Sequence, residues 1–322
     1  MKMSMKLATL LLAVAGTTAQ AQQFPTKPIT IVSPFAQGGT SDFVGRIVAH
    51  RIEENNPGWR FIIDTRPGAD GQIGSNLVAK SAPDGYTLCL GPSSTHAIQP
   101  SVFKKLPYDV LRDFTGITML GATANIIAVH PSIPATNVKE LIAYAKANPG
   151  KLNFSSPGTG TSIHISGEMF NDAAGIDMLH VPFKGSGPSM AAVLGGQVQV
   201  LFENISAAVP NVKAGTLRAI AVTSMTRSSA LPEVPTLNES GLPGFEVLAW
   251  FSMFAPAATP KDIVAKLNAE FVKALRDPAV QSQMNSRGLE PRPMAPEEFN
   301  AIWRKDVEKY AAIVKKAKIS VD

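Results

Sequence analysis

Residues 29–42 read ITIVSPFAQGGTSD, and residues 152–164 read LNFSSPGTGTSIH. Each stretch is a short apolar run that leads through Ser-Pro and a glycine loop into Gly-Thr-Ser. Glycine lets the backbone turn sharply and approach a ligand, and Thr and Ser are favoured as helix N-caps. We therefore expect two strand–loop–helix units of one design, one in each half of the chain. Ordinary helix capping is the alternative explanation for either copy taken alone.

The rest of the chain alternates short apolar runs with helical stretches. The apolar runs do not alternate strictly with polar residues, which is typical of strands buried on both faces of a parallel sheet covered by helices. The fold class is therefore α/β. The expected strands lie at 29–33, 61–64, 86–91, 114–120, 125–130, 152–155, 178–181, 198–202, 217–222 and 245–254, and the segment 260–318 is expected to be mainly helical.

The N-terminus has the pattern of an export signal. Lys2 and Lys6 precede an apolar run at 7–16, and Ala19-Gln20-Ala21 supplies small residues for cleavage after Ala21. A membrane anchor is the weaker alternative, because the run is much shorter than the roughly 20 apolar residues that a spanning helix needs. We expect residues 1–21 to be a signal peptide and the mature chain to be soluble and periplasmic.

Composition narrows the function further. A mature chain of about 300 residues is longer than a single hydrophobic core usually supports, so its length favours two lobes. Two signal-peptide lysines account for part of the formal charge of +5, so the mature side chains carry +3, without a basic run that would suit nucleic acid. The single cysteine, Cys89, lies in an apolar run, where a buried hydrophobe is a better interpretation than a catalytic thiol.

The two glycine loops together favour an anionic ligand. In an open α/β sheet the ligand crevice lies at the C-terminal ends of the strands. Two such sheets facing each other across a hinge direct both helix N-termini into one cleft. Free N–H groups and the positive end of each helix dipole then favour negative charge there.

Enzymatic function is the alternative from a different class. The five histidines fall in no His-Glu-x-x-His pattern, and the chain has no Gly-x-Ser-x-Gly elbow. The loop at Gly158 and Gly160 lacks the third glycine of a dinucleotide fingerprint, and no P-loop lysine follows either loop. Ser162, His164 and Glu203 are the residue types of a serine hydrolase triad, but nothing in their spacing supports one. We therefore expect no catalytic residue, no cofactor and no metal.

Several stretches resemble the Bug receptors, the substrate-binding proteins of tripartite tricarboxylate transporters. These matches follow one another in order along nearly the whole mature chain, and they include residues 24–29 (FPTKPI), 66–69 (RPGA), 82–88 (APDGYTL), 180–186 (HVPFKGS) and 194–198 (LGGQV). The resemblance implies a two-lobed periplasmic binding protein, with residues 24–123 plus 226–322 as one lobe and residues 124–225 as the other.

The resemblance also implies how the ligand is held. The family binds carboxylates through N–H groups, hydroxyls and waters at the two glycine loops, and a strand-end segment contributes beside them. The positions implied here are Phe35, Gly39, Thr40, Asp42, Thr95, His96, Gly160, Thr161, Ser162, His164 and Glu203. We expect a monomer that passes a small organic carboxylate to membrane transporter subunits. A sensor that presents the ligand to a signalling kinase is the alternative.

Some of these residues also have structural explanations. Asp42 suits the first turn of a helix, His164 and His96 suit structural hydrogen bonds, and Phe35 suits a core. Glu203 stands where many relatives have aspartate after phenylalanine. A buried acid there suits a ligand ammonium or hydroxyl and disfavours a second carboxylate, unless the longer glutamate side chain turns out to solvent.

Overall fold

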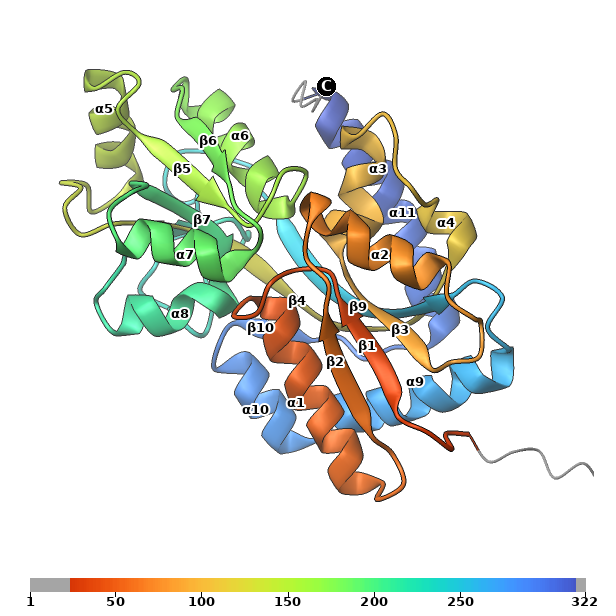
Figure 1. The fold of residues 1–322 in the computed structure, drawn as a ribbon. Helices are drawn as coiled ribbons and strands as arrows, with labels where there is room; N and C mark the ends of the chain where they lie inside the picture. Colours follow the sequence, from red (N-terminus) through yellow and green to blue (C-terminus); the bar gives the residue numbers. More distant parts are fainter. Residues whose placement is uncertain (1–23, 317–322) are drawn as a thin grey trace, which may run out of the picture.

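The computed structural model describes residues 24–316. The predicted signal peptide, residues 1–21, lies outside the described residues, so its cleavage stays a prediction. The described chain folds into two halves, each with a sheet that has helices on both faces (Figure 1). The α/β class expected from the sequence is confirmed.

The first half is built on a parallel trio of strands. Strand β1 lies between β2 and β3, and β9 pairs with β3 in the antiparallel sense. Side chains of β1 alternate between two cores, with Ile29 and Ile31 facing one and Val32 the other. The elements are β1 (Ile29–Ser33), α1 (Thr40–Asn55), β2 (Phe61–Thr65), α2 (Gln72–Ala79), β3 (Thr87–Pro92), β9 (Leu248–Pro256), α9 (Lys261–Leu275), α10 (Pro278–Asn285) and α11 (Pro296–Lys316).

The second half repeats this plan. Strand β5 lies between β6 and β7 in the parallel sense, and alternate side chains of β7 again face two cores, one beside α6 and one beside α7 and α8. The elements are α5 (Val138–Ala147), β5 (Asn153–Ser156), α6 (Ser162–Ala174), β6 (Leu179–Pro182), α7 (Ser186–Leu194), β7 (Val200–Asn204), α8 (Ile205–Lys213) and β8 (Arg218–Val222).

One long strand joins the halves. The sequence predicted separate strands at 114–120 and 125–130, but the structure has a single strand β4 (Phe114–Val129). Its residues 114–124 pair with β9, and its residues 125–129 pair with β7 and β8. The prediction of two strands was wrong because the small residues between them, from Gly121 to Ala124, are buried in the sheet and form no turn. The short strand β10 (Leu289–Pro291) also pairs with β4, and it lies inside the segment 260–318 that the sequence predicted to be mainly helical.

The return to the first half lies later than the sequence suggested. We expected the first lobe to resume at residue 226, but Ala230, Leu231 and Val234 pack in the core beside α7 and α8. Phe245 and Val247 pack in the core beside α6. We therefore propose β9, rather than residue 226, as the point of return.

Between β3 and β4 the chain makes several short elements that the sequence did not predict. A π-helical turn (Ser94–Ile98) follows β3 directly and continues into α3 (Gln99–Val102), and α4 (Val110–Asp113) precedes β4. A 3-10 turn (Ala69–Gly71) likewise precedes α2. Cys89 on β3 is fully buried, and burial raises the pKa of its thiol to about 12, so it is a core side chain.

Candidate ligand cleft between the two halves

A small cavity lies where the two glycine loops meet. Its volume is about 30 Å³, which is room for about one water molecule. Anything much larger than a water molecule can therefore enter only if the two halves separate. Both halves and the connecting strand β9 line the cavity, through Phe35, Ala36, Gly39, Thr40, Ser41, Pro92, Ser94, Pro157, Thr161, Ser162, Ile163, Ser186, Asn204, Ala249 and Phe251.

The first glycine loop presents an open helix N-terminus to this cavity. Gly39 is the N-cap of α1 and supplies no side-chain cap. Among the hydrogen bonds of residues 24–316, none uses the N–H of Thr40 or Ser41, and both residues line the cavity. Unpaired N–H groups at the positive end of a 16-residue helix are suited to bind an anion.

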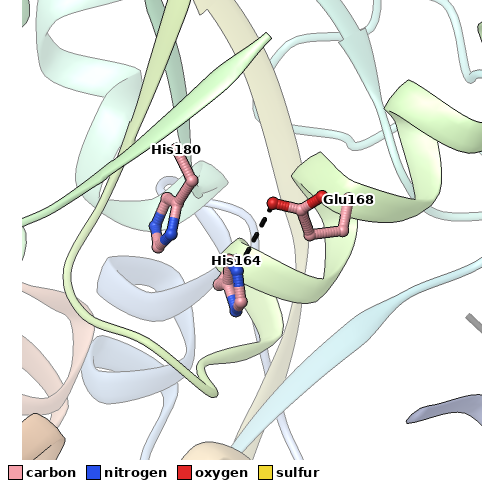
Figure 2. A group of neighbouring side chains, drawn as sticks. All are labelled: His164, Glu168 and His180. Carbon is pink, nitrogen blue, oxygen red and sulfur yellow. Dashed lines mark ion pairs between the residues drawn. The ribbon is translucent and has the colours of Figure 1, made fainter. Parts of the chain in front are cut away.

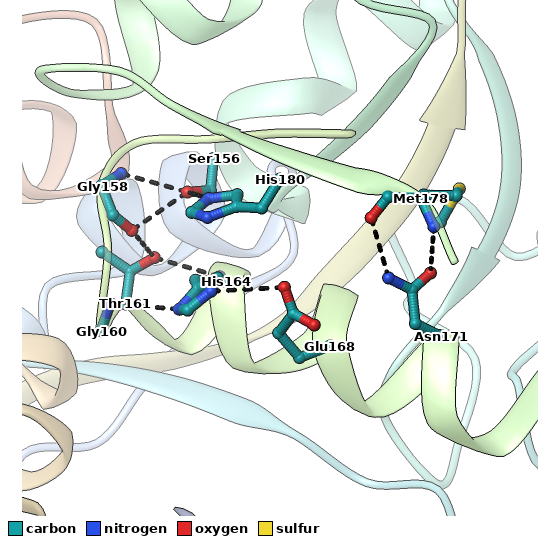
Figure 3. Close-up of polar contacts among 9 residues, drawn as sticks. All are labelled: Ser156, Gly158, Gly160, Thr161, His164, Glu168, Asn171, Met178 and His180. Atoms are coloured by element: carbon teal, nitrogen blue, oxygen red, sulfur yellow. Dashed lines mark hydrogen bonds and ion pairs between the residues drawn. The ribbon is translucent and has the colours of Figure 1, made fainter. Parts of the chain in front are cut away.

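The second glycine loop is different, because the N–H groups of Gly158, Thr159 and Gly160 already have hydrogen-bond partners. Gly158 N–H donates to Ser156 Oγ (3.2 Å), and Gly160 N–H donates to His164 Nδ1 (3.2 Å). Thr159 N–H donates to the Asp70 carboxylate of the other half (2.9 Å). The side chain of Thr161 caps α6 by accepting from His164 N–H (3.1 Å), as Figure 3 shows. The Thr161 hydroxyl in turn donates to the Gly158 carbonyl at 2.8 Å, whereas the hydroxyl of Ser162, on the cavity wall, has no hydrogen-bond partner within residues 24–316.

Hydrogen bonds cross directly between the halves at this point. Thr40 Oγ1 lies 2.6 Å from Ser206 Oγ, and both side chains are buried. The Asp70 contact comes from a turn in which Ala69 and Asp70 both have positive φ, of 44° and 53°. A Cβ at Gly39 would lie 2.9 Å from Ser186 Oγ, so glycine lets the halves approach closely here.

The structure brings some of the predicted site residues together. Phe35, Gly39, Thr40, Thr161 and Ser162 line the cavity, and Gly160 precedes the Thr161 cap. The role of each in ligand binding stays a prediction.

Other predicted residues lie away from the cavity wall. The Asp42 carboxylate pairs with Arg46 on the next turn of α1, with 2.7 Å between Oδ1 and Nε. Thr95 is fully buried, and its Oγ1 lies 2.8 Å from His96 Nδ1. In their place Ser94, one residue earlier, lines the cavity.

His96 lies inside an aromatic core. Its ring stacks on Phe254 with 4.2 Å between centroids, and its carbonyl accepts from Trp303 Nε1 at 2.6 Å. Full burial lowers the pKa of His96 to about 3, so the ring is neutral at physiological pH. The π-helical turn after β3 produces this arrangement, because it directs Ser94 and His96 to opposite sides.

His164, Glu168 and His180 form a second histidine cluster behind the second glycine loop (Figure 2). The two rings stack at 4.1 Å and 24°, so their in-plane lone pairs run nearly parallel. Zn²⁺ needs ligand lone pairs that converge on it from about 2 Å. The ring nitrogens are also engaged, since His164 lies 3.5 Å from Glu168 and His180 Nε2 lies 2.6 Å from Ser156 Oγ. The arrangement fits a hydrogen-bonded scaffold for the loop and does not fit a metal centre.

Glu203 is fully buried at the end of β7. It lies on the same face of the strand as Leu201, whose core includes residues of α7, whereas Phe202 packs in the core beside α6. Glu203 is therefore on the other side of the sheet from His164, so Ser162, His164 and Glu203 do not form a serine hydrolase triad. The alternative in which its side chain turns to solvent is wrong.

The sequence did not identify Ser94, Ser186 and Asn204 as cavity residues. Ser186 begins α7 after Gly185, whose φ is 124°. A glycine followed by a serine at a helix start could have identified Ser186 as a cavity residue, because the two glycine loops have the same pattern. These residues end the stretch HVPFKGS. Asn204 follows Glu203 and bonds Asn125 Oδ1 at 2.7 Å, a contact that no local pattern predicts.

Sequence comparison identifies the receptor class. A model of the "Tripartite tricarboxylate transporter family receptor" matches residues 44–319. The chain belongs to this family. It is 34% identical to the protein BugT of Bordetella pertussis over 307 residues, which cover 94% of each chain.

Solved receptors have the same fold. The R. palustris protein Rpa4515, solved with adipate, is 33% identical, has a TM-score of 0.90, and the match covers 92% of this chain and 100% of that one. MatC from Rhodopseudomonas palustris, with bound malate, is 33% identical with a TM-score of 0.86 over 90% and 100% of the two chains. The resemblance to Bug receptors is confirmed: the chain is a periplasmic solute-binding receptor and not an enzyme. Within residues 24–316, we find no helix with the length and apolarity to cross a membrane.

Proposed function

We propose that this receptor closes its two halves on a small organic carboxylate and delivers it to the membrane subunits of a tripartite tricarboxylate transporter. The observation that carries the proposal is the uncapped N-terminus of α1, which presents the N–H groups of Thr40 and Ser41 to the cavity between the halves. Relatives of similar fold that hold adipate and malate support the same ligand class.

The helix dipole alone is too weak to explain capture. It contributes about 0.3–1 kcal/mol, or up to ~2 kcal/mol when partly buried. Micromolar affinity corresponds to ~8 kcal/mol. We infer that the rest comes from hydrogen bonds of the Thr40 and Ser41 N–H groups and the Ser162 hydroxyl, and from exclusion of water when the halves close. Phe35 would pack on the carbon chain of the acid.

Export completes the proposal. Lys2, Lys6, the apolar run at 7–16 and Ala19-Gln20-Ala21 are a signal-peptide pattern, and cleavage after Ala21 would release a soluble, monomeric receptor. N-terminal sequencing of the protein from a periplasmic extract tests the cleavage site directly. A chain that still begins at Met1 would contradict it.

Ligand class is tested by thermal-shift and native mass spectrometry measurements on the mature protein. Adipate, malate and monocarboxylates should raise the melting temperature, whereas the matched amides should not. Equal stabilisation by acids and neutral amides would contradict anion capture.

The transport role needs a separate test, because a sensor that docks to a kinase would bind the same acids. Affinity purification from membranes should recover a large and a small integral membrane subunit. Recovery of a histidine kinase alone would favour the sensor.

A further inference from the structure

A buried polar recess lies behind the cavity wall at Ser186. Glu203 is fully buried there, and its Oε1 accepts from Asn204 N–H at 2.8 Å. Its Oε2 has no hydrogen-bond partner within residues 24–316, and neither do the hydroxyls of Ser155 and Ser189. Strand alternation places Ser155 on the face of its strand opposite Phe154, and Ser189 lies one helical turn after Ser186 on α7. These groups therefore gather under the start of α7.

Within residues 24–316, no cationic side chain pairs with the Glu203 carboxyl. The elements beside it, α7, β5 and β4, contain no titratable side chain, and Lys213 stands at the far end of α8. Lys184, just before α7, is exposed. The His164–Glu168–His180 cluster lies on the other side of the sheet, and Asp42 of the other half is paired with Arg46. A buried carboxylate without a countercharge is strongly disfavoured.

Ser186 connects this recess to the ligand cavity. Its side chain lines the cavity, and its hydroxyl lowers the pKa of the nearby Glu203 carboxyl, although no hydrogen bond between the two side chains is formed within residues 24–316. A serine hydroxyl has a single proton to donate. An ionised Glu203 would draw that proton to its unpartnered Oε2, and Ser186 would then turn only lone pairs toward the cavity. When Glu203 is protonated, its O–H donates to Ser186 Oγ, and the serine proton is free for a ligand carboxylate.

We propose that Glu203 takes up one proton when an organic carboxylate binds, so that this receptor captures the anion together with a proton. The inference rests on the proposed function, because it states which charge Glu203 carries when the proposed carboxylate ligand is bound. The balance is simple: the ionised receptor, one solvent proton and the carboxylate anion give a complex in which Glu203 is neutral and the ligand keeps its charge. Glu203 thereby determines at which pH an anion is accepted.

The pKa of Glu203 in the free receptor determines how the ligand affinity changes with pH. Burial raises the pKa of Glu203 to about 7, against smaller lowering by the Asn204 N–H and the Ser186 hydroxyl. A ligand carboxylate nearby raises it further, since like charges disfavour ionisation. Well below pH 7 Glu203 is protonated before and after binding, so its contribution to the affinity is constant there. Above pH 7 binding requires a proton, and affinity falls up to about tenfold per pH unit.

Isothermal titration with adipate and with malate tests this in two buffers of different ionisation enthalpy. At pH 8 we expect an uptake of nearly one proton per ligand bound, and at pH 5.5 almost none. Binding at pH 8 without proton uptake would overturn the proposal.

Two matched variants test whether Glu203 is the group that takes up the proton. Glu203→Gln carries a permanent neutral donor, so it should bind at pH 8 about as tightly as at pH 5.5 and take up no proton. Glu168→Gln removes a different acid, beside His164, and should keep the wild-type pH dependence. If Glu203→Gln kept the pH dependence, a histidine would be responsible and the proposal would be wrong.

The free protein supplies an independent readout. At pH 6 the infrared C=O band of a protonated carboxyl group should be present in the wild type, shift when Ser186 is changed to Ala, and be missing in Glu203→Gln. Absence of that band would overturn the proposal even if both acids bind. If neither acid binds but the band is present, the proposed function is contradicted, whereas the protonated state of Glu203 in the free protein is confirmed.

Discussion

The two glycine loops look alike in sequence but differ in the hydrogen bonds they leave open. At the first loop, α1 begins at Thr40 without a side-chain cap. Thr40 and Ser41 line the cavity, and their N–H groups have no hydrogen-bond partner within residues 24–316. At the second loop, Thr161 caps α6, and the N–H groups of Gly158, Thr159 and Gly160 are already taken.

We propose that the first loop is the main anion-binding loop and that the second mainly supports it. The first loop has the N–H groups of Thr40 and Ser41 to offer, whereas the second offers the Ser162 hydroxyl and the Ile163 N–H beside a backbone that is held by its own contacts. A repeated motif therefore indicates repeated backbone shape, and the surrounding side chains decide which copy binds.

The largest expected effect comes from removing one N–H at each helix start. Thr40→Pro and Ser162→Pro are matched, because both residues are the first of their helices and both preceding residues are extended, which proline tolerates. Thr40→Ala and Ser162→Ala, which remove only the hydroxyls, serve as the references for the two proline variants. Thr40→Pro should weaken carboxylate binding about ten- to a hundredfold, the cost of a lost charge-assisted hydrogen bond. Ser162→Pro should cost clearly less, since its N–H already faces Ser94 Oγ at 3.4 Å. Titration calorimetry measures both, and equal losses would contradict the asymmetry.

A second pair of variants separates stability from closure. Thr161→Ala removes the cap of α6 and should lower the free energy of unfolding by about 0.5–2 kcal/mol. Gly39→Ala removes no cap, but its new Cβ would meet Ser186 Oγ at 2.9 Å and should hinder closure instead. Urea unfolding should therefore respond mainly to Thr161→Ala, and ligand affinity mainly to Gly39→Ala. The opposite assignment would count against the roles given to the two loops.

The smallest expected effect concerns the Asp70 contact with Thr159 N–H. Asp70→Ala should remove the acceptor and favour separated halves, so we expect a slightly larger radius of gyration in small-angle scattering and a few-fold weaker affinity, from about 1 kcal/mol. Asp70→Asn keeps an acceptor oxygen and tolerates positive φ, so it should resemble the wild type. If Asp70→Ala bound more tightly, the freed Thr159 N–H would itself be an anion donor.

Local patterns predicted the parts of the fold that depend on local chemistry. The strand–loop–helix units follow from apolar runs, glycines and N-cap residues, and they correctly brought Thr40, Thr161 and Ser162 near one another. The pattern did not reveal that His96 faces an aromatic core, because that depends on a π-helical turn after β3. It also missed Asp70, whose partner Thr159 lies 89 residues away in the chain.

The single strand β4 has a consequence for folding. Since residues 114–124 complete the first sheet and residues 125–129 complete the second, neither half contains all of its own backbone partners without this shared strand. An isolated half would expose an unpaired strand edge, which is prone to aggregation. The two halves should therefore melt in one cooperative transition, so calorimetry should find equal calorimetric and van't Hoff enthalpies for the whole receptor.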